Sequence, residues 1–455
     1  MTLGEVSKHQ RCHLPSLSEG NPLMLPGLTV PGSLAVLLQA FRSCFRLRPF
    51  EVFCLLAVGM VTQTGWCTVT GMLTGAGMQT VVSHHRAHRF FSTHAWSADQ
   101  LGLAMARLIV ATLVPAGAGL HLAVDDSLCR RRGTGVHGAF WTHDASQPGQ
   151  VIARGNRWVI VGIVVALPFS SRPTCLPVLF RLWGGKGSTT PVELARTLVG
   201  LLARAFPDRA IHLVADAAYH GKPLQDLPER VTWTTRIQRN GVLYQPAPPP
   251  TGKRGRPAPK ATGSVPPPRP PLAPGHRGPL RPHRHRAPRR GRLPVVRRFG
   301  KRTGRLIAAA EGAGEEGRQL LLFTTDLAAP AEQIITRYAA RWSIEVAIET
   351  AKGPMGVGQA RNRVELAVQR TVPFGMLTMS LVYCWYTRYG HHPDDVTARR
   401  AAAPWYTTKT EPSFADMLAT LRRTIIADRF LPEWPAQPTL EQITAVHRAW
   451  ASAAA

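Results

Sequence analysis

The stretch from Arg230 to Ala310 constrains the fold of this chain more than any other feature. It holds 20 Lys or Arg residues and no Asp or Glu, and its middle is almost entirely Pro, Arg, Gly and His. Such a composition cannot bury enough apolar surface to fold compactly by itself. Strand-like pattern resumes at residues 304–309 and 319–325. We therefore expect one fold that is interrupted by an insertion and continues beyond it.

The charge of the whole chain indicates a polyanionic partner. The 455 residues carry a formal net charge of +28, and nucleic acid is the simplest partner for such an excess. The apolar runs are shorter or more interrupted than the stretch of about 20 residues that spans a membrane, and the N-terminus has no apolar segment typical of a signal peptide. We expect a cytoplasmic, nucleoid-associated protein with no membrane partner and no small-molecule substrate.

Apolar residues at three- and four-residue spacing predict a helical region between Ser33 and Leu120. Within it, Glu51–Met60 and Thr68–Leu73 could form a helix-turn-helix, with the basic residues of 84–89 contacting phosphates. An ordinary helix pair with a solvated basic face is the simpler interpretation. We expect this region to be the DNA-binding domain in either case.

Strands mixed with helices follow, which is typical of an α/β unit. Residues 119–124 are expected to form a strand that runs into Asp125 and Asp126, and residues 210–215 a strand that runs into Asp216. Functional groups in such sheets tend to lie at strand ends. These aspartates are therefore candidate site residues.

A third carboxylate lies on a later predicted helix. At 100° per residue, Tyr338, Arg341, Glu345, Glu349 and Lys352 fall within an arc of about 80°. A stripe of mixed charges on a lone helix is usually a solvated face with ion pairs. Here two strand-terminal aspartates precede it, and three converging carboxylates repel each other unless a hard cation such as Mg²⁺ lies between them.

The spacing Tyr338-x2-Arg341-x3-Glu345-x6-Lys352 resembles the Tyr-Arg-Glu-Lys signature of the DDE transposases encoded by bacterial insertion sequences. The segments around Asp126 and Asp216 resemble the two aspartate motifs of that branch. The resemblance implies a ribonuclease-H-like fold: a mixed α/β sheet with flanking helices, interrupted by an insertion and preceded by the helical N-terminal domain.

The resemblance also implies an activity. We expect metal-dependent cleavage at the ends of an element in double-stranded DNA, followed by strand transfer into target DNA by a homodimer. Two Mg²⁺ ions, or Mn²⁺ as a substitute, would be held by Asp126, Asp216 and Glu345, with Asp126 contacting both ions. Tyr338, Arg341 and Lys352 would bind phosphates near the scissile bond.

Three alternatives remain open at this point. Asp126 is favoured over Asp125 because it precedes the hydroxyl residue Ser127, but Asp125 would face the other way if the strand continues. Residues 260–298 are either a DNA-gripping insertion or, as we favour, the product of a frame shift in a GC-rich gene. The chain could also be an inactive, transposase-derived DNA-binding protein.

The expected domain organisation follows these patterns. The parts are a flexible arm (1–30), the helical DNA-binding domain (31–118), the first part of the catalytic core (119–229), the basic insertion (230–303), the second part of the core (304–400) and a C-terminal helical region (401–455).

Overall fold

The computed structural model describes a large part of the chain. Its residues are 25, 27–144, 147–149, 151–237, 243–244, 264–265, 295–299, 302–311, 318–430, 440–441 and 444–446. Most of the predicted arm 1–30, most of the insertion 230–303 and part of the C-terminal region 401–455 lie outside these residues. Within the part that is described, no helix has the length and apolar character needed to cross a bilayer.

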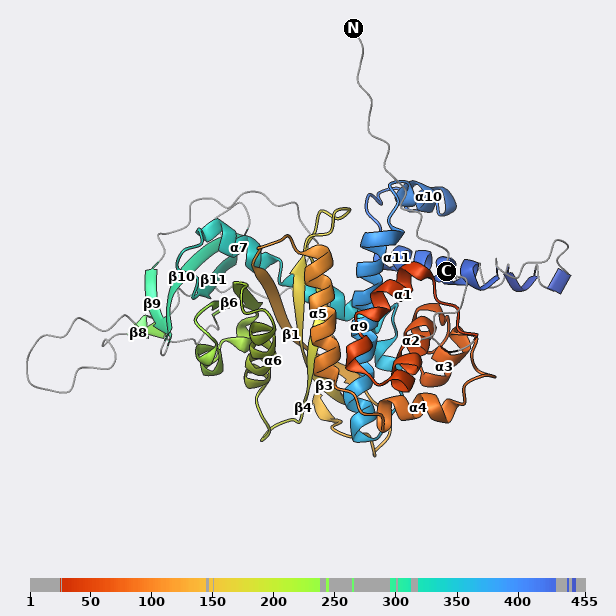
Figure 1. The fold of residues 1–455 in the computed structure, drawn as a ribbon. Helices are drawn as coiled ribbons and strands as arrows, with labels where there is room; N and C mark the ends of the chain where they lie inside the picture. The colour runs from red at the N-terminus through yellow and green to blue at the C-terminus, as the bar shows by residue number, and fades with distance from the viewer. Residues whose placement is uncertain are drawn as a thin grey trace, which may run out of the picture.

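A mixed sheet forms the centre of the molecule (Figure 1). Strand β1 (Leu120–Arg130) pairs antiparallel with β3 (Ile152–Val165), which pairs antiparallel with β4 (Thr174–Trp183). On its other side β1 pairs in parallel with β5 (Ile211–Ala215), and β5 with β6 (Val231–Arg236). This order, β4-β3-β1-β5-β6 with β1 central, is the ribonuclease-H-like arrangement that the resemblance implied.

The fold does continue beyond the insertion, as the sequence predicts. Strand β11 (Arg318–Thr324) pairs antiparallel with β6, and β10 (Arg302–Glu311) pairs with β11. Chain on both sides of the insertion therefore contributes to one sheet. The remaining strands are β2 (Phe140–His143), β7 (Leu243–Tyr244), β8 (Ser264–Val265) and β9 (Val295–Phe299).

The N-terminal region is helical, as expected, and it packs beside the sheet (Figure 1). It lies against two helices from the far end of the chain, α9 (Glu365–Trp385) and α11 (Phe414–Phe430), while the short α10 (Asp395–Ala402) lies between these two in sequence. The N-terminal helices are α1 (Gly32–Gln39), α2 (Leu47–Thr62), α3 (Val69–Gly75), α4 (His84–Ser92) and α5 (Ala98–Leu113).

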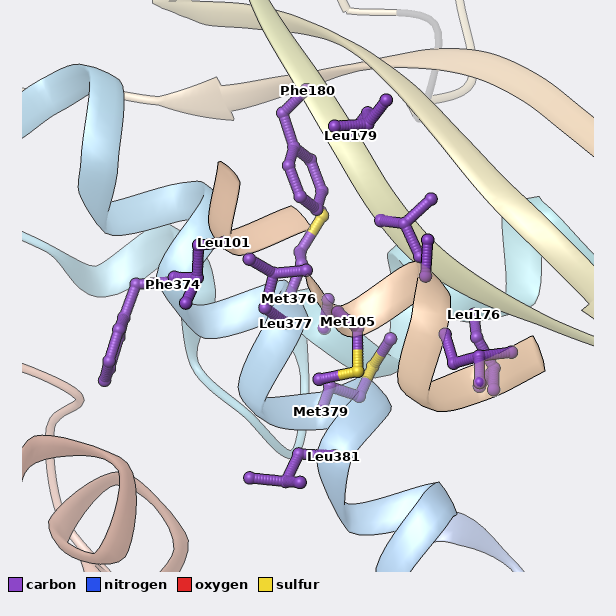
Figure 2. Packing of buried hydrophobic residues seen from close by; sticks show 14 of the residues in the cluster. Leu101, Met105, Leu176, Leu179, Phe180, Phe374, Met376, Leu377, Met379 and Leu381 are labelled. Carbon is purple, nitrogen blue, oxygen red and sulfur yellow. The ribbon is translucent and has the colours of Figure 1, made fainter. Parts of the chain in front are cut away.

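Helices α5 and α9 connect this helical region to the sheet by packing on β4 (Figure 2). Leu101 and Met105 of α5 meet Met376 and Met379 of α9 in one continuous cluster of buried residues, which also takes in the sheet. Helix α5 approaches β4 closely, because a Cβ at Gly102 would lie 2.0 Å from the carbonyl oxygen of Val178 in β4. The helical region and the sheet thus share a core.

Strand β4 is absent from the sequence-based expectations, and its proline explains why. Pro177 lies inside the strand, and a proline cannot donate to a sheet ladder. The pairing of β4 with β3 shifts register between Val161 and Gly162, opposite this proline. The bulge accommodates the missing N–H group, and the carbonyl oxygen of Pro177 accepts a hydrogen bond from Ser380 of α9 at 3.0 Å.

Three further helices complete the core. Helix α6 (Pro191–Ala205) begins with a capping box in which Thr190 and Glu193 bond each other's backbone N–H groups, and it packs on β3 and β4. Helix α7 (Ala331–Ala339) packs on β5 and β6, while α8 (Trp342–Lys352) packs on β1 and β4. The predicted single helix over 338–352 is therefore two helices, with the break at Ala340 and Arg341.

Candidate active site

Both aspartates of β1 lie within the strand and not at its end. Pairing with β3 continues through Asp125, opposite Ile160, and Asp126, opposite Val159, as far as Arg130. The expectation that this strand stops at Val124 is wrong, because polar residues after a strand's apolar run do not end its hydrogen-bonded ladder. Since successive side chains of a strand point to opposite faces, the two aspartates cannot belong to the same site.

Asp216 lies beside Asp125 across the parallel pair of strands. Val124 is in register with Ala215, the last residue of β5, so Asp125 and Asp216 are the next residues along. The backbone of Asp216 is still extended, and its Oδ1 accepts a hydrogen bond from the N–H of Ala218 at 2.7 Å. The predicted placement of Asp216 directly after a strand is confirmed, and it falls on the side of Asp125.

Glu345 reaches the same place from α8, through Arg341. Nη1 of Arg341 lies 2.7 Å from Oε1 of Glu345 and 3.8 Å from Oδ2 of Asp125. Both carboxylates approach the same guanidinium nitrogen. The separation between Oε1 of Glu345 and Oδ2 of Asp125 therefore cannot exceed the sum of these two distances. The arginine is mostly buried, with 14% of its side chain exposed. It lies between two like charges that would otherwise repel each other.

The electrostatic state of Asp125 is unusual. Burial raises the pKa of its carboxyl group to about 7, and the neighbouring charges of Asp126 and Asp216 act in the same direction. A hydrogen bond from the N–H of Asp126 to Oδ1 at 2.8 Å, together with the charge of Arg341, opposes that rise in pKa. This carboxylate is thus short of positive charge even with Arg341 beside it.

Asp126 faces the other side of the sheet. Its Oδ1 lies 2.7 Å from Nε of Arg157, and its Oδ2 lies 3.5 Å from the hydroxyl of Tyr219. The Arg157 guanidinium also lies over the ring of Trp183, 5.4 Å from the centroid. Of the two aspartates, the structure brings Asp125 together with Glu345, and it places Asp126, the residue that the sequence favoured, in a separate ion pair.

The other two signature residues extend along α7 and α8. Tyr338 lies in the last turn of α7, half-buried, with the Arg341 guanidinium 5.8 Å from its ring centroid. Burial raises the pKa of its hydroxyl. Lys352 is the last residue of α8, and its charge, with that of Arg131, opposes the rise in pKa that burial imposes on Cys129 of β1. Helix α8 therefore runs along β1.

Two residues of this region had no role in the sequence analysis. Arg157 and Tyr219 are 31 and 93 residues from Asp126 in sequence, and no local pattern links them to it. The alternation of side chains along β1 was the one available indication. If the strand continues past Asp126, Asp125 and Asp126 point to opposite faces of the sheet.

The donor set fits a divalent cation. Among the described residues, no three acidic, histidine or cysteine side chains are already gathered closely enough to hold a metal ion, and Arg341 lies between two of the candidates. The three groups are carboxylates, the ligands that hard divalent ions prefer. Burial, the main cause of the raised pKa of Asp125, disfavours its charged form, and a positive charge beside it would oppose that effect.

Comparison with known proteins assigns the family. The family described as DDE superfamily endonuclease matches residues 40–273, just over half of the chain. The match includes α2 to α6 and β1 to β6 with both candidate aspartate segments, and it ends before α7 and α8. A comparison with curated proteins finds no match. By the extent of the family match, this chain belongs to the DDE superfamily endonucleases.

Proposed function

We propose that this chain is a DNA transposase that cuts the ends of a bacterial insertion sequence and joins them to target DNA. The observation that carries the proposal is the contact of Arg341 with both Asp125 and Glu345, where Asp125 and Asp216 each directly follow the paired residues Val124 and Ala215. The three acidic groups come from separate parts of the chain. Glu345 belongs to the Tyr-Arg-Glu-Lys spacing, and Asp125 and Asp216 come from the parallel strands β1 and β5. The active complex would be a homodimer on two DNA ends.

Asp125, Asp216 and Glu345 would hold the divalent cations, Mg²⁺ with Mn²⁺ as a substitute. When bound, such ions neutralise the phosphate, lower the pKa of water and stabilise the departing oxygen. Asp125 is preferred to Asp126 because Asp126 already has a partner, Arg157 at 2.7 Å, on the opposite face. A cation at Asp125 would also remove the electrostatic cost that raises its pKa.

The chain's own residues would bind and orient the phosphodiester. Arg341 keeps 14% of its side chain exposed, and through that part its guanidinium would bind a phosphate oxygen. Lys352 forms no ion pair within the part of the chain that is described, and it would neutralise a neighbouring phosphate. Tyr338 would donate a hydrogen bond from its hydroxyl group to a phosphate oxygen.

The reaction would proceed in two displacements at phosphorus. In the first, the oxygen of water forms a bond to phosphorus and loses a proton to solvent, while the bond from phosphorus to the 3′ oxygen breaks and that oxygen takes up a proton to become a 3′-hydroxyl. In the second, the freed 3′-hydroxyl attacks a phosphate of target DNA and loses its proton to solvent, while the bond from that phosphorus to the target's own 3′ oxygen breaks and the departing oxygen takes up a proton. Since bonds are exchanged one for one, strand transfer needs no further energy source.

The test is metal-dependent nicking of duplex DNA that carries the sequences flanking the gene. Glu345→Gln should reduce nicking in Mg²⁺ by a factor of about 10² or more, while DNA binding in EDTA persists. Glu349→Gln is the matched control, because Glu349 lies one turn further along α8 and is exposed. Undiminished nicking by Glu345→Gln would remove Glu345 from the mechanism.

A further inference from the structure

Trp66 forms an exposed aromatic surface between α2 and α3. The residue is 64% exposed, although tryptophan buries a large apolar area wherever it can. The guanidinium of Arg361 lies over its ring, 5.3 Å from the centroid, and Arg361 is itself exposed. The two residues are 295 positions apart, so this pair of a cation and an aromatic ring is made by the fold. We call it the Trp66–Arg361 platform.

The platform is held in place by backbone contacts. The N–H of Cys67, next to Trp66, donates to Oε1 of Gln359 at 2.6 Å. Gly356 has a left-handed backbone (φ 59°), and a Cβ there would lie 2.8 Å from Cβ of Cys67. The turn that carries Trp66 and the segment that follows α8 are therefore packed too closely for the platform to be a chance arrangement of two mobile side chains.

The same segment is anchored to the end of β1. The Nη1 of Arg131 donates to the carbonyl oxygens of Gly358 and Ala360, and its Nε donates to Asn156 at 3.0 Å. The N–H of His137 donates to the carbonyl oxygen of Arg363 at 2.9 Å. The platform thus lies at the end of the strand that carries Asp125.

The distance from Asp125 to the platform can be estimated along β1. Asp125, Cys129 and Arg131 point to one face by strand alternation, and α8 runs along that face from Glu345 to Lys352. Arg131 lies six positions beyond Asp125 and directly after the last residue of β1, which corresponds to roughly 20 Å of extended chain. This is the length of about six base pairs of duplex DNA.

The charge around the platform suits a phosphate backbone. Lys352 ends the helix α8 that runs from the carboxylate cluster along β1, and Arg361 and Arg363 are exposed in the segment that carries the platform. The nearby Glu365 lies 3.8 Å from His137. Nucleic-acid-binding surfaces combine cations with aromatic faces. The cations contact phosphates, and the aromatic faces contact bases or sugars.

We propose that the Trp66–Arg361 platform binds the DNA substrate about six base pairs from the scissile phosphate. Arg361 neutralises a backbone phosphate, and the exposed ring of Trp66 packs against the adjoining nucleotide. The proposal rests on the proposed function, since it places the scissile phosphate at Asp125, and it adds a contact from the helical N-terminal region to the same DNA.

Fluorescence anisotropy of the full chain with a labelled duplex of about four helical turns, in EDTA, tests this contact without cleavage. Arg361→Gln should weaken binding about tenfold and reduce the slope of log Kd against log salt by about one. Trp66→Leu should weaken binding about fivefold or more. The controls are Trp141→Leu, at an equally exposed tryptophan on β2, and Lys186→Gln, at an exposed lysine before α6.

Binding by Arg361→Gln and Trp66→Leu that equals that of the controls, in proteins with unchanged thermal unfolding, would overturn the platform. This outcome is separate from the test of Glu345. A chain that loses affinity at the platform but never nicks DNA would contradict the proposed function alone, and a chain that nicks DNA with unaltered affinity in both variants would contradict the platform alone.

Discussion

Asp125 and Asp126 are neighbours in the chain, yet they meet different arginines on opposite faces of the central sheet. Asp125 lies 3.8 Å from Arg341, and Asp126 lies 2.7 Å from Arg157. Because the first arginine also contacts Glu345 and the second does not, the two aspartates have different tasks. We propose that Asp125 belongs to the cation-holding cluster and that Asp126 stabilises the strand and the turn after β5 through Arg157 and Tyr219.

Asp126→Asn should therefore lower stability while activity persists in the folded fraction. The change leaves the Arg157 charge, only 28% exposed, without its partner, which costs about 1–3 kcal/mol. Urea unfolding of the wild type, of each single variant and of Asp126→Asn combined with Arg157→Met measures the coupling between the two. Additive losses would contradict the ion pair.

Stability should fall in mild acid because of His212. This buried residue lies between the hydroxyls of Thr232 and Thr234, at 2.7 and 3.0 Å, and burial lowers its pKa to about 3. The charges of Arg337 and His121 act in the same direction, and Asp326 opposes them.

The sign follows from the unfolded chain, in which histidine has a pKa of about 6.5. The stability that depends on neutral His212 is complete above that value and is lost as the pH falls toward 3. At pH 5 the loss from this group is about 2 kcal/mol. In urea unfolding, His212→Gln should flatten the fall in stability between pH 7 and pH 5, and an unchanged slope would refute the assignment.

Gly59→Ala should disturb the contact between α2 and α3. A Cβ at Gly59 would lie 1.8 Å from the carbonyl oxygen of Met72, a backbone atom that cannot move aside by rotating. Overpacking of this kind costs at least about 1–3 kcal/mol. Gly65→Ala is the control, since nothing lies within 4 Å of its Cβ position. Equal thermal unfolding of the two variants would show that the helices separate at no cost.

Much of the fold could be predicted from periodicity. Helices α2 and α5 and strands β5, β10 and β11 occur where apolar spacing placed them, and Asp216 follows its strand as expected. The prediction of one interrupted fold succeeded because an insertion without acidic residues contrasts sharply with the strands on either side.

The errors came from information that is not local. β1 was ended too early because Asp125 and Asp126 are polar, although pairing with β3 continues beneath them. β4 was missed because Pro177 argues against a strand unless the bulge next to it, at Val178 of the same strand, is known. The preference for Asp126 over Asp125 stays a prediction, and the sequence could not inform it further, because it shows which residues alternate but not that α8 covers the face of Asp125.

Binding of Mn²⁺ tests the central claim most directly, because it reports on the carboxylate cluster without requiring DNA. Electron paramagnetic resonance titration of the full chain should show that Asp125→Asn weakens Mn²⁺ binding about tenfold or more, as should Glu345→Gln, while Asp126→Asn binds like the wild type. Wild-type affinity in Asp125→Asn, or its loss in Asp126→Asn alone, would contradict the account.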